Sequence, residues 1–332
     1  MSPAVSVVIC THAPRGEVLA RTIDGLRCQT LPVEAWELIV VDNSSPDPVV
    51  EAVVAWHPRG RIVREPALGL THARLCGISS GRAGLLLFVD DDNVLAPDYL
   101  EQAVAIHRRL PMLGCFGAAV IEPEYEEEPA VQLRPFMSML ALRSAAVSRW
   151  SNDPHDPFTP WGAGLAVTRQ VAEAVAAATG AQPLKGSLDR KGDSLSSCGD
   201  DEFSWVACES GWGRGVFTEL RLTHLIPRGR VQKDYLLRLA EGLAFSRIVL
   251  WHLHGHEGHV VRPLAPPGRL AALALSGQTR RLGSEMLEYG RVLAQSRVQR
   301  EFRRAKRRGE ERARAFLAAG AAASADRGAG RS

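Results

Sequence analysis

The segment L-L-L-F-V-D-D-D, Leu85–Asp92, runs five apolar residues directly into three consecutive carboxylates. A short apolar run of this kind is typical of a strand that is buried on both faces of a parallel sheet. Asp90, Asp91 and Asp92 then fall at the carboxyl end of the strand, the edge at which open α/β sheets bind ligands. Adjacent carboxylates repel one another unless a cation compensates them, and hard divalent ions prefer oxygen ligands. The segment therefore predicts a strand that leads into a metal site.

The rest of the amino-terminal third alternates strand-like with helix-like segments. In chain order these segments are Val5–Cys10, Glu17–Arg27, Glu37–Val41, Val49–Trp56, Arg61–Arg64, Thr71–Ser80, Leu85–Val89, Pro97–Arg109 and Cys115–Ile121. The alternation is typical of βαβ units on a mostly parallel sheet. We predict an α/β fold in which a Rossmann-like, mostly parallel sheet has helices on both faces. From Tyr235 onward the pattern predicts a helical C-terminal extension.

Composition narrows the class of protein. The chain has 332 residues, 45% of them hydrophobic, and a formal net charge of only +3, so global charge gives no indication of a nucleic-acid partner. Its six cysteines are scattered singly, which favours reduced thiols over a zinc module or a disulfide framework. We find no secretory leader and no apolar stretch of the ~18 residues that a membrane span needs. A cytoplasmic protein is expected.

A basic tail follows Arg291. It carries one lysine and many arginines, among them Arg303, Arg304, Lys306 and Arg314. A solvated helix face explains this pattern, and so does contact with anionic lipid headgroups at the inner face of a membrane.

Polar residues also follow other predicted strands. Thr11 and His12 close the first strand, and Asp42 follows E-L-I-V-V, either as a turn cap or as a ligand contact at the same sheet edge. Arg74 lies near the start of a predicted helix, where free N–H groups and the helix dipole favour phosphate. Three strand ends are therefore expected to converge on one crevice.

Three signals lie further along the chain. W-G-A-G contains Gly162, Ala163 and Gly164, and its glycines permit either close approach to a ligand or a plain turn. C-G-D-D-E-F places Asp200 and Asp201 at a helix start, where one of them could cap the helix or serve as a general base. His224 interrupts an apolar run, as a core residue or as a ligand for a divalent ion.

Together these motifs resemble the family-2 glycosyltransferases, inverting enzymes of the GT-A fold that use nucleotide-sugar donors. The resemblance covers roughly residues 5–230. V-V-D-N-S-S is similar to the family's V-D-D-G-S, G-L-T-H-A-R-L-C-G-I to its G-x-x-x-A-R-N-x-G, and F-V-D-D-D-N to its D-x-D motif. The sequence departs from the family where Asn43 replaces the second Asp of V-D-D-G-S and Gly199 replaces the acid before the base.

The resemblance implies a role for each motif. Mn²⁺ or Mg²⁺ would be held by Asp92 and His224 with Asp90 or Asp91, and the nucleotide-sugar would be bound by Thr11, His12, Asp42, Arg74, Asp90, Asp91, Gly162, Ala163 and Gly164. An ungapped match puts the catalytic base on Asp200, and a shift of one residue would choose Asp201. The donor would be a UDP-, GDP- or dTDP-sugar, and the acceptor a carbohydrate or a lipid-linked molecule in polysaccharide, glycolipid or other glycoconjugate biosynthesis.

The resemblance also implies a division of the chain. Residues 1–230 would form the transferase domain, with a nucleotide-binding half at about 1–120 and an acceptor-side half at about 121–230. Residues 231–318 would form the helical extension, and the alanine- and glycine-rich residues 319–332 are expected to be disordered.

Two alternatives remain open at this point. A nucleotidyltransferase can use a similar sheet and acidic pair, but T-H-A-P-R-G is a poor version of the basic, glycine-rich loop that it needs. A non-catalytic module that binds a nucleotide or a partner protein is the other alternative. The joint presence of Asp90–Asp92, Asp200 and His224 argues against it.

Overall fold

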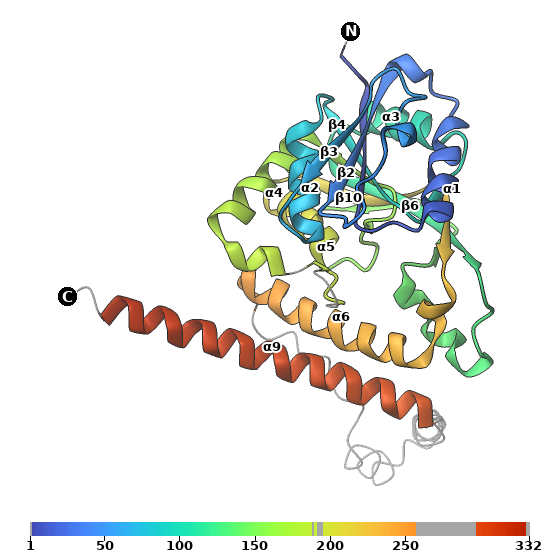
Figure 1. Ribbon diagram of the computed structural model, residues 1–332. Coiled ribbons are helices and arrows are strands. Elements are labelled where there is room, and N and C mark those ends of the chain that lie inside the picture. Colours follow the sequence, from blue (N-terminus) through green and yellow to red (C-terminus); the bar gives the residue numbers. More distant parts are fainter. Residues whose placement is uncertain (1, 188, 191–194, 257–296, 330–332) are drawn as a thin grey trace, which may run out of the picture.

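The computed structural model describes residues 2–187, 189–190, 195–256 and 297–329. A curved sheet forms the centre, helices cover both of its faces, and two long helices cross one side of the molecule (Figure 1). The strands are β1 Val5–Thr11, β2 Trp36–Asn43, β3 Gly60–Glu65, β4 Leu85–Asp90, β5 Asn93–Leu95, β6 Leu113–Tyr125, β7 Arg143–Ser144, β8 Arg149–Ser151, β9 Leu165–Thr168 and β10 Gly213–Ile226. The α-helices are α1 Gly16–Arg27, α2 Leu70–Ser80, α3 Tyr99–Arg109, α4 Arg169–Ala181, α5 Gly199–Glu209, α6 Lys233–Leu253 and α9 Arg297–Ala329. Short 3₁₀ segments are η1 Val33–Ala35, η2 Glu51–Val53, η3 Val131–Leu140, η4 Pro183–Ser187 and η5 Arg228–Val231.

The strand order in the sheet is β3-β2-β1-β4-β9-β6-β10-β5. The long strands pair in parallel, β3 with β2, β2 with β1, β1 with β4, and β6 with β10, while β9 and the short strands β5, β7 and β8 pair antiparallel. The predicted α/β class is confirmed. Because β1, β2 and β4 are parallel and adjacent, their carboxyl ends meet at one edge.

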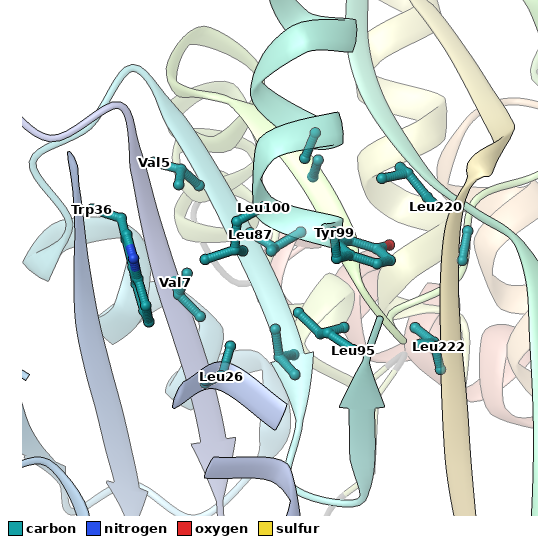
Figure 2. Packing of buried hydrophobic residues seen from close by; sticks show 14 of the residues in the cluster. Val5, Val7, Leu26, Trp36, Leu87, Leu95, Tyr99, Leu100, Leu220 and Leu222 are labelled. Carbon is teal, nitrogen blue, oxygen red and sulfur yellow. The ribbon is translucent and has the colours of Figure 1, made fainter. Parts of the chain in front are cut away.

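Burial on both faces explains why β1, β2 and β4 are nearly continuous apolar runs. Figure 2 shows the core on one face, where Val5 and Val7 of β1 and Leu87 of β4 pack with Leu100 of α3. On the opposite face, alternate residues such as Val8, Ile39, Leu86 and Phe88 pack with Ala73 and Ile78 of α2, Val171 of α4 and Phe203 of α5. Each aliphatic side chain buried in this way contributes ~1.5–3 kcal/mol.

The helices α6 and α9 lie side by side along the edge of the molecule (Figure 1). Phe302 and Ala305 of α9 pack against Leu236 and Leu239 of α6. Gly309 permits the close approach of the two backbones, since a Cβ there would lie 2.1 Å from the carbonyl oxygen of Glu241. Among the described helices none is both long enough and apolar enough to cross a membrane.

Three expectations differ from the structure. The segment Val49–Trp56, expected to be helix-like, contains only the three-residue 3₁₀ turn η2. The strand expected at Cys115–Ile121 is longer in the structure, since residues 122–125 continue β6 and pair with β10. The tail expected to be disordered from residue 319 instead continues α9 as far as Ala329. Residues 257–296 of the predicted helical extension lie outside the described ranges, and the domain division at residue 230 stays a prediction.

Candidate functional site

A cavity of about 280 Å³ opens at the carboxyl ends of β1, β2 and β4. The parallel register places Thr11 beside Asp42 and Cys10 beside Asp90, so the strand ends meet there as predicted. Ten predicted site residues line it: Thr11, His12, Arg74, Asp90, Asp91, Asp92, Gly162, Ala163, Asp200 and His224. Asp42, Gly164 and Asp201 do not line this cavity.

The three consecutive acids differ in their surroundings. Asp90 and Asp91 are deep in the cavity, and burial followed by the charge of Asp92 raises the pKa of both carboxyls, that of Asp91 to about 6. The hydroxyl of Thr11 donates a hydrogen bond to Asp91 Oδ2. For Asp92, burial alone would raise the pKa, but the contact with His224 and the charges of Arg230 and Arg190 lower it overall. Asp92 is therefore the permanently charged member of the group.

Asp92 and His224 lie together because β10 pairs antiparallel with β5, which sets His224 opposite Asn93. His224 Nε2 is 3.4 Å from Asp92 Oδ2, and its Nδ1 lies 3.0 Å from the carbonyl oxygen of Leu140 in η3. The carbonyl can only accept, so Nδ1 carries the proton in this hydrogen bond, and the lone pair of Nε2 faces the carboxylate.

Asp92 Oδ2 and His224 Nε2 are both electron-rich, and a neighbouring cation is needed to offset their repulsion. Arg230 supplies one here, since its Nη1 lies 2.7 Å from Asp92 Oδ2 and 3.3 Å from His224 Nε2. A carboxylate and a neutral imidazole with its other nitrogen tied to a carbonyl are suited to Mn²⁺ or Mg²⁺. The residues present therefore fit a divalent metal, whose remaining ligands would be phosphate oxygens and water.

The predicted third metal ligand is not assembled with this pair. Within the ranges that the structure describes, no three histidine, cysteine or acidic side chains surround a common metal position. Asp90 lines the same cavity, and its role as a ligand stays a prediction.

Arg74 is a second fixed cation in the cavity. Its side chain is buried and forms an ion pair of 3.0 Å with Asp189, which also accepts a hydrogen bond from Thr71. Burial would lower the pKa of Arg74, but the charges of Asp189, Asp200 and Asp90 raise it overall. The guanidinium therefore stays charged and is shared among acids from separate segments of the chain.

Gly162 separates Arg74 from Asp200. A Cβ at this position would lie 2.6 Å from Arg74 Nη2 and 3.7 Å from Asp200 Oδ2, so only glycine leaves both side chains where they are. The amide of Gly162 donates to Asp200 Oδ2 at 2.8 Å, and the amide of Asp201 donates to Asp200 Oδ1 at 3.0 Å. Asp200 is thus held by two backbone donors with its carboxylate at the cavity wall.

Asp201 has a different environment. Burial and the charge of Asp200 raise its pKa to about 7, and the thiol of Cys198 is its hydrogen-bond partner. Because Asp201 is outside the cavity lining and Asp200 is within it, the geometry favours Asp200 of the two predicted bases.

Asp42 caps the turn after β2, which is one of the two roles that the sequence allowed for it. Its buried carboxylate accepts hydrogen bonds from the amides of Ser45 and Val49, at 3.0 and 3.2 Å, and from Arg64 at 2.6 Å. Burial would raise the pKa of Asp42, but these hydrogen bonds lower it. A direct contact between Asp42 and a nucleotide stays a prediction.

Asn43, not Asp42, reaches the cavity from β2. Its Nδ2 donates to the carbonyl oxygens of Ala67 and Glu65, at 2.7 and 3.3 Å, and its Oδ1 accepts the amide of Gly69 at 2.8 Å. Only an amide side chain can both donate and accept in this way. The departure from V-D-D-G-S therefore fixes the loop that leads into α2.

Gly164 shapes the turn into β9. It has a φ of +70°, and a Cβ would lie 2.4 Å from the hydroxyl of Tyr99, which donates to the Gly164 carbonyl at 2.7 Å. The left-handed backbone and this close approach both require glycine.

Sequence reasoning missed several residues that line the cavity. Asp189 and Arg190 come from the polar loop before α5, Arg230 comes from η5, and Met139, Leu140 and Ala141 come from the end of η3. These segments are short and irregular, so no periodicity marks them. The two arginines close to the acids of D-D-D could have been sought as counter-charges, but their positions depend on tertiary structure.

Comparison with known proteins agrees with this geometry. The family model described as "Glycosyl transferase family 2" matches residues 6–163. Validoxylamine A glucosyltransferase of Streptomyces hygroscopicus subsp. jinggangensis is 30% identical over 164 residues, which are 47% of this chain and 38% of the relative. The putative glycosyltransferase EpsH of Bacillus subtilis is 30% identical over 105 residues, 30% of this chain and 29% of that protein. The chain thus matches only 38% and 29% of the length of these two curated relatives.

Among solved structures, the chain resembles mannosyltransferase PcManGT from Pyrobaculum calidifontis, which was solved in complex with GDP-Man and Mn²⁺. The TM-score is 0.53 with 18% sequence identity, and the likeness covers 98% of this chain and 81% of that one. At this identity the likeness concerns the fold, which is the GT-A glycosyltransferase fold. The matches in sequence and in fold agree, and residues 6–163 match glycosyltransferase family 2.

Proposed function

We propose that this protein is a metal-assisted, inverting glycosyltransferase that moves a sugar from a nucleoside-diphosphate sugar to an acceptor hydroxyl. One observation carries the proposal: the Asp92–His224 pair and the backbone-held Asp200 line the same cavity. A site for a diphosphate and a site for a proton acceptor are what the transfer requires.

On the leaving-group side, Asp92 and His224 would hold Mn²⁺ or Mg²⁺. When bound, such an ion neutralises the charge that develops on the departing nucleoside diphosphate. Arg74, Arg190 and Arg230 add positive charge around the same cavity, and Arg74 is kept in place by Asp189. These side chains orient the diphosphate and keep its negative charge away from Asp90 and Asp91.

On the nucleotide side, the ends of β1 and β2 form one wall. Thr11, His12 and Asn43 line it, and His12 Nδ1 donates to the Asn43 carbonyl at 2.8 Å. Asp42 binds the backbone amides of Ser45 and Val49 and so fixes the turn that follows β2. Its substitution would therefore disturb nucleotide binding even without direct contact.

The acceptor side contains the base. Asp200 removes the proton of the acceptor hydroxyl as this oxygen attacks the anomeric carbon from the face opposite the diphosphate, and a single displacement inverts the configuration. The two amides that bind Asp200 fix the direction of its carboxylate. This pre-organisation reduces the entropy that must be lost at the transition state.

The names of the relatives guide the choice of donor. One curated relative is named a glucosyltransferase, and the structural neighbour was solved with GDP-Man and Mn²⁺. We therefore propose a nucleoside-diphosphate hexose as donor. The proposed acceptor is a carbohydrate or a lipid-linked molecule of polysaccharide, glycolipid or other glycoconjugate biosynthesis.

Release of nucleoside diphosphate tests the proposal. The purified protein is incubated with Mn²⁺ and, in separate reactions, UDP-glucose, GDP-mannose and dTDP-glucose, and products are identified by mass spectrometry. We expect release of the diphosphate from one donor, and its loss in Asp92→Asn. Release of pyrophosphate would identify a nucleotidyltransferase instead, and binding of every nucleotide without turnover would identify a non-catalytic module.

A further inference from the structure

A second cavity, of about 270 Å³, lies between η3 and α9 and is separate from the catalytic cavity. Its lining residues are Pro135, Phe136, Gln299, Phe302, Arg303 and Lys306. We call this the η3/α9 cavity. None of these residues takes part in the proposed transfer. Their combination of aromatic and basic side chains therefore points to a different role.

The floor of the η3/α9 cavity is aromatic. Phe136 and Phe302 are stacked with ring centroids 3.7 Å apart and planes at 7°. Phe302 is fully packed against α6, whereas Phe136 is only half-buried and Pro135 is exposed. The stacked rings hold η3 and α9 together and leave an apolar surface that is open on one side.

The rim of the same cavity is cationic. Arg303 and Lys306 are exposed, and within the described part of the chain no ion pair is found for either. Three other basic residues of α9 have acidic partners: Arg308 and Arg312 bind Glu241 of α6, and Arg307 binds Glu311. Arg303 and Lys306 thus place two unneutralised charges where the aromatic floor is open, and the exposed Arg304 and Arg314 add two more on α9 without an ion pair in the described ranges.

The segment η3 links this cavity to the catalytic one. Val131 at its start is 74% exposed, Phe136 in its middle lines the η3/α9 cavity, and Leu140 at its end both lines the catalytic cavity and binds His224. At ~2 Å rise per residue in a 3₁₀ segment, Phe136 and Leu140 are about 8 Å apart along η3. The η3/α9 cavity and the catalytic cavity are therefore lined by neighbouring parts of the same segment η3.

We infer that the η3/α9 cavity binds the phosphate headgroup of an anionic lipid and docks the domain on a membrane surface. Arg303 and Lys306 would bind the phosphate, while Phe136 and the exposed Val131 would contact the acyl boundary, the arrangement by which peripheral proteins bind anionic bilayers. This surface lies outside the residues proposed for transfer, so its binding to lipid does not depend on the proposed function.

Vesicle binding tests it with the full chain. Co-sedimentation is measured with phosphatidylcholine vesicles and with vesicles that contain 30% phosphatidylglycerol, at two salt concentrations. We expect binding to the anionic vesicles alone. Each basic side chain near an anionic bilayer contributes roughly fivefold to the partition coefficient, so Arg303→Ala/Lys306→Ala should lower it about 25-fold.

The matched control removes the same charge elsewhere. Arg82→Ala/Arg108→Ala replaces two exposed arginines that have no ion pair within the described ranges, and Arg108 belongs to α3, far from α9 (Figure 1). We expect near wild-type vesicle binding for this control. Equal loss in both double variants, or equal binding to neutral vesicles, would overturn the inference. So would tight binding to a single-stranded RNA probe with no binding to vesicles.

A fluorescent probe gives a second readout that does not depend on charge. Val131→Cys and Val50→Cys, at positions 74% and 64% exposed, are labelled with an environment-sensitive dye in a background where the exposed Cys28 is serine. Anionic vesicles should shift the emission of the dye to the blue at position 131 and leave it unchanged at position 50. A shift at both positions or at neither contradicts docking through η3.

Discussion

Arg230 and Asp92 form an ion pair of 2.7 Å inside the catalytic cavity, and the same guanidinium nitrogen lies 3.3 Å from His224 Nε2. The cation of Arg230 thus contacts both side chains that are proposed to hold the metal. A divalent ion that uses both of them must displace it.

Arg230→Gln should therefore bind Mn²⁺ more tightly than the wild type when no nucleotide is present. We expect about a tenfold lower dissociation constant, equivalent to ~1.4 kcal/mol, by calorimetric titration. Arg228→Gln in the same segment η5 is the matched control, since Arg228 is exposed. Unchanged or weaker Mn²⁺ binding in Arg230→Gln would show that Arg230 does not compete with the metal.

Asp200→Asn should lower the turnover number for transfer by roughly 10²–10⁴, the usual contribution of a general base. Asp201→Asn, one residue away and outside the cavity lining, should retain most of the activity. The measurement is initial rate at saturating donor. The reverse order of the two effects would move the base to Asp201.

Gly162→Ala should disturb Arg74, because the added Cβ would lie 2.6 Å from Arg74 Nη2. We expect about a tenfold higher KM for the donor from steady-state kinetics, since Arg74 can no longer hold its position beside Asp189. Gly180→Ala in α4 is the control, as a Cβ there meets no atom within 4 Å. Donor affinity at the wild-type level in Gly162→Ala would remove Arg74 from the binding site.

Asn43→Asp restores the residue found in the family motif, yet it should destabilise this protein. An aspartate cannot donate to the carbonyls of Ala67 and Glu65 and would place negative charge beside them. The free energy of unfolding should fall by roughly 1–3 kcal/mol in urea denaturation. Asn152→Asp on an exposed loop is the comparison, and equal stability of the two variants would contradict this role for Asn43.

Asp201 should make stability fall with rising pH. Burial and the charge of Asp200 raise its pKa from 3.8 to about 7, so between about pH 4 and pH 7 the folded state retains a proton that the unfolded chain has lost. The free energy of unfolding therefore decreases across this window.

Asp201→Asn should flatten this decrease and should be more stable than the wild type at pH 8. Urea denaturation at pH 4, 6 and 8 checks it, with Asp47→Asn on an exposed loop as the control. A wild-type pH profile retained in Asp201→Asn would contradict the assignment.

Short apolar runs in the sequence correctly predicted the strands that carry this site. The strand that leads into Asp90–Asp92 and the convergence of three strand ends follow from short apolar runs buried on both faces, a property that each segment carries by itself. His224 could be placed on a strand for the same reason. Its pairing with Asp92 depends on β5, a strand of three residues with no pattern of its own.

Long-range contacts explain what the sequence could not predict. Asp42 became a buried turn cap because β3 places Arg64 beside it, which no local motif indicates. Arg230 and Asp189 lie in irregular segments whose positions follow from the packing of η5 and of the loop before α5. The helical tail beyond residue 319 continues a helix whose earlier turns are fixed by α6, so composition alone was misleading there.

The central claim is the separation of metal binding at Asp92 from proton transfer at Asp200. Calorimetric titration with UDP and with GDP, each with and without Mn²⁺, tests it most directly in the wild type, Asp92→Asn and Asp200→Asn. We predict that one nucleotide binds the wild type in a Mn²⁺-dependent manner, that Asp200→Asn binds it within a few fold, and that Asp92→Asn loses the dependence on Mn²⁺. Mn²⁺-dependent binding that survives in Asp92→Asn, or that disappears in Asp200→Asn, would contradict the account.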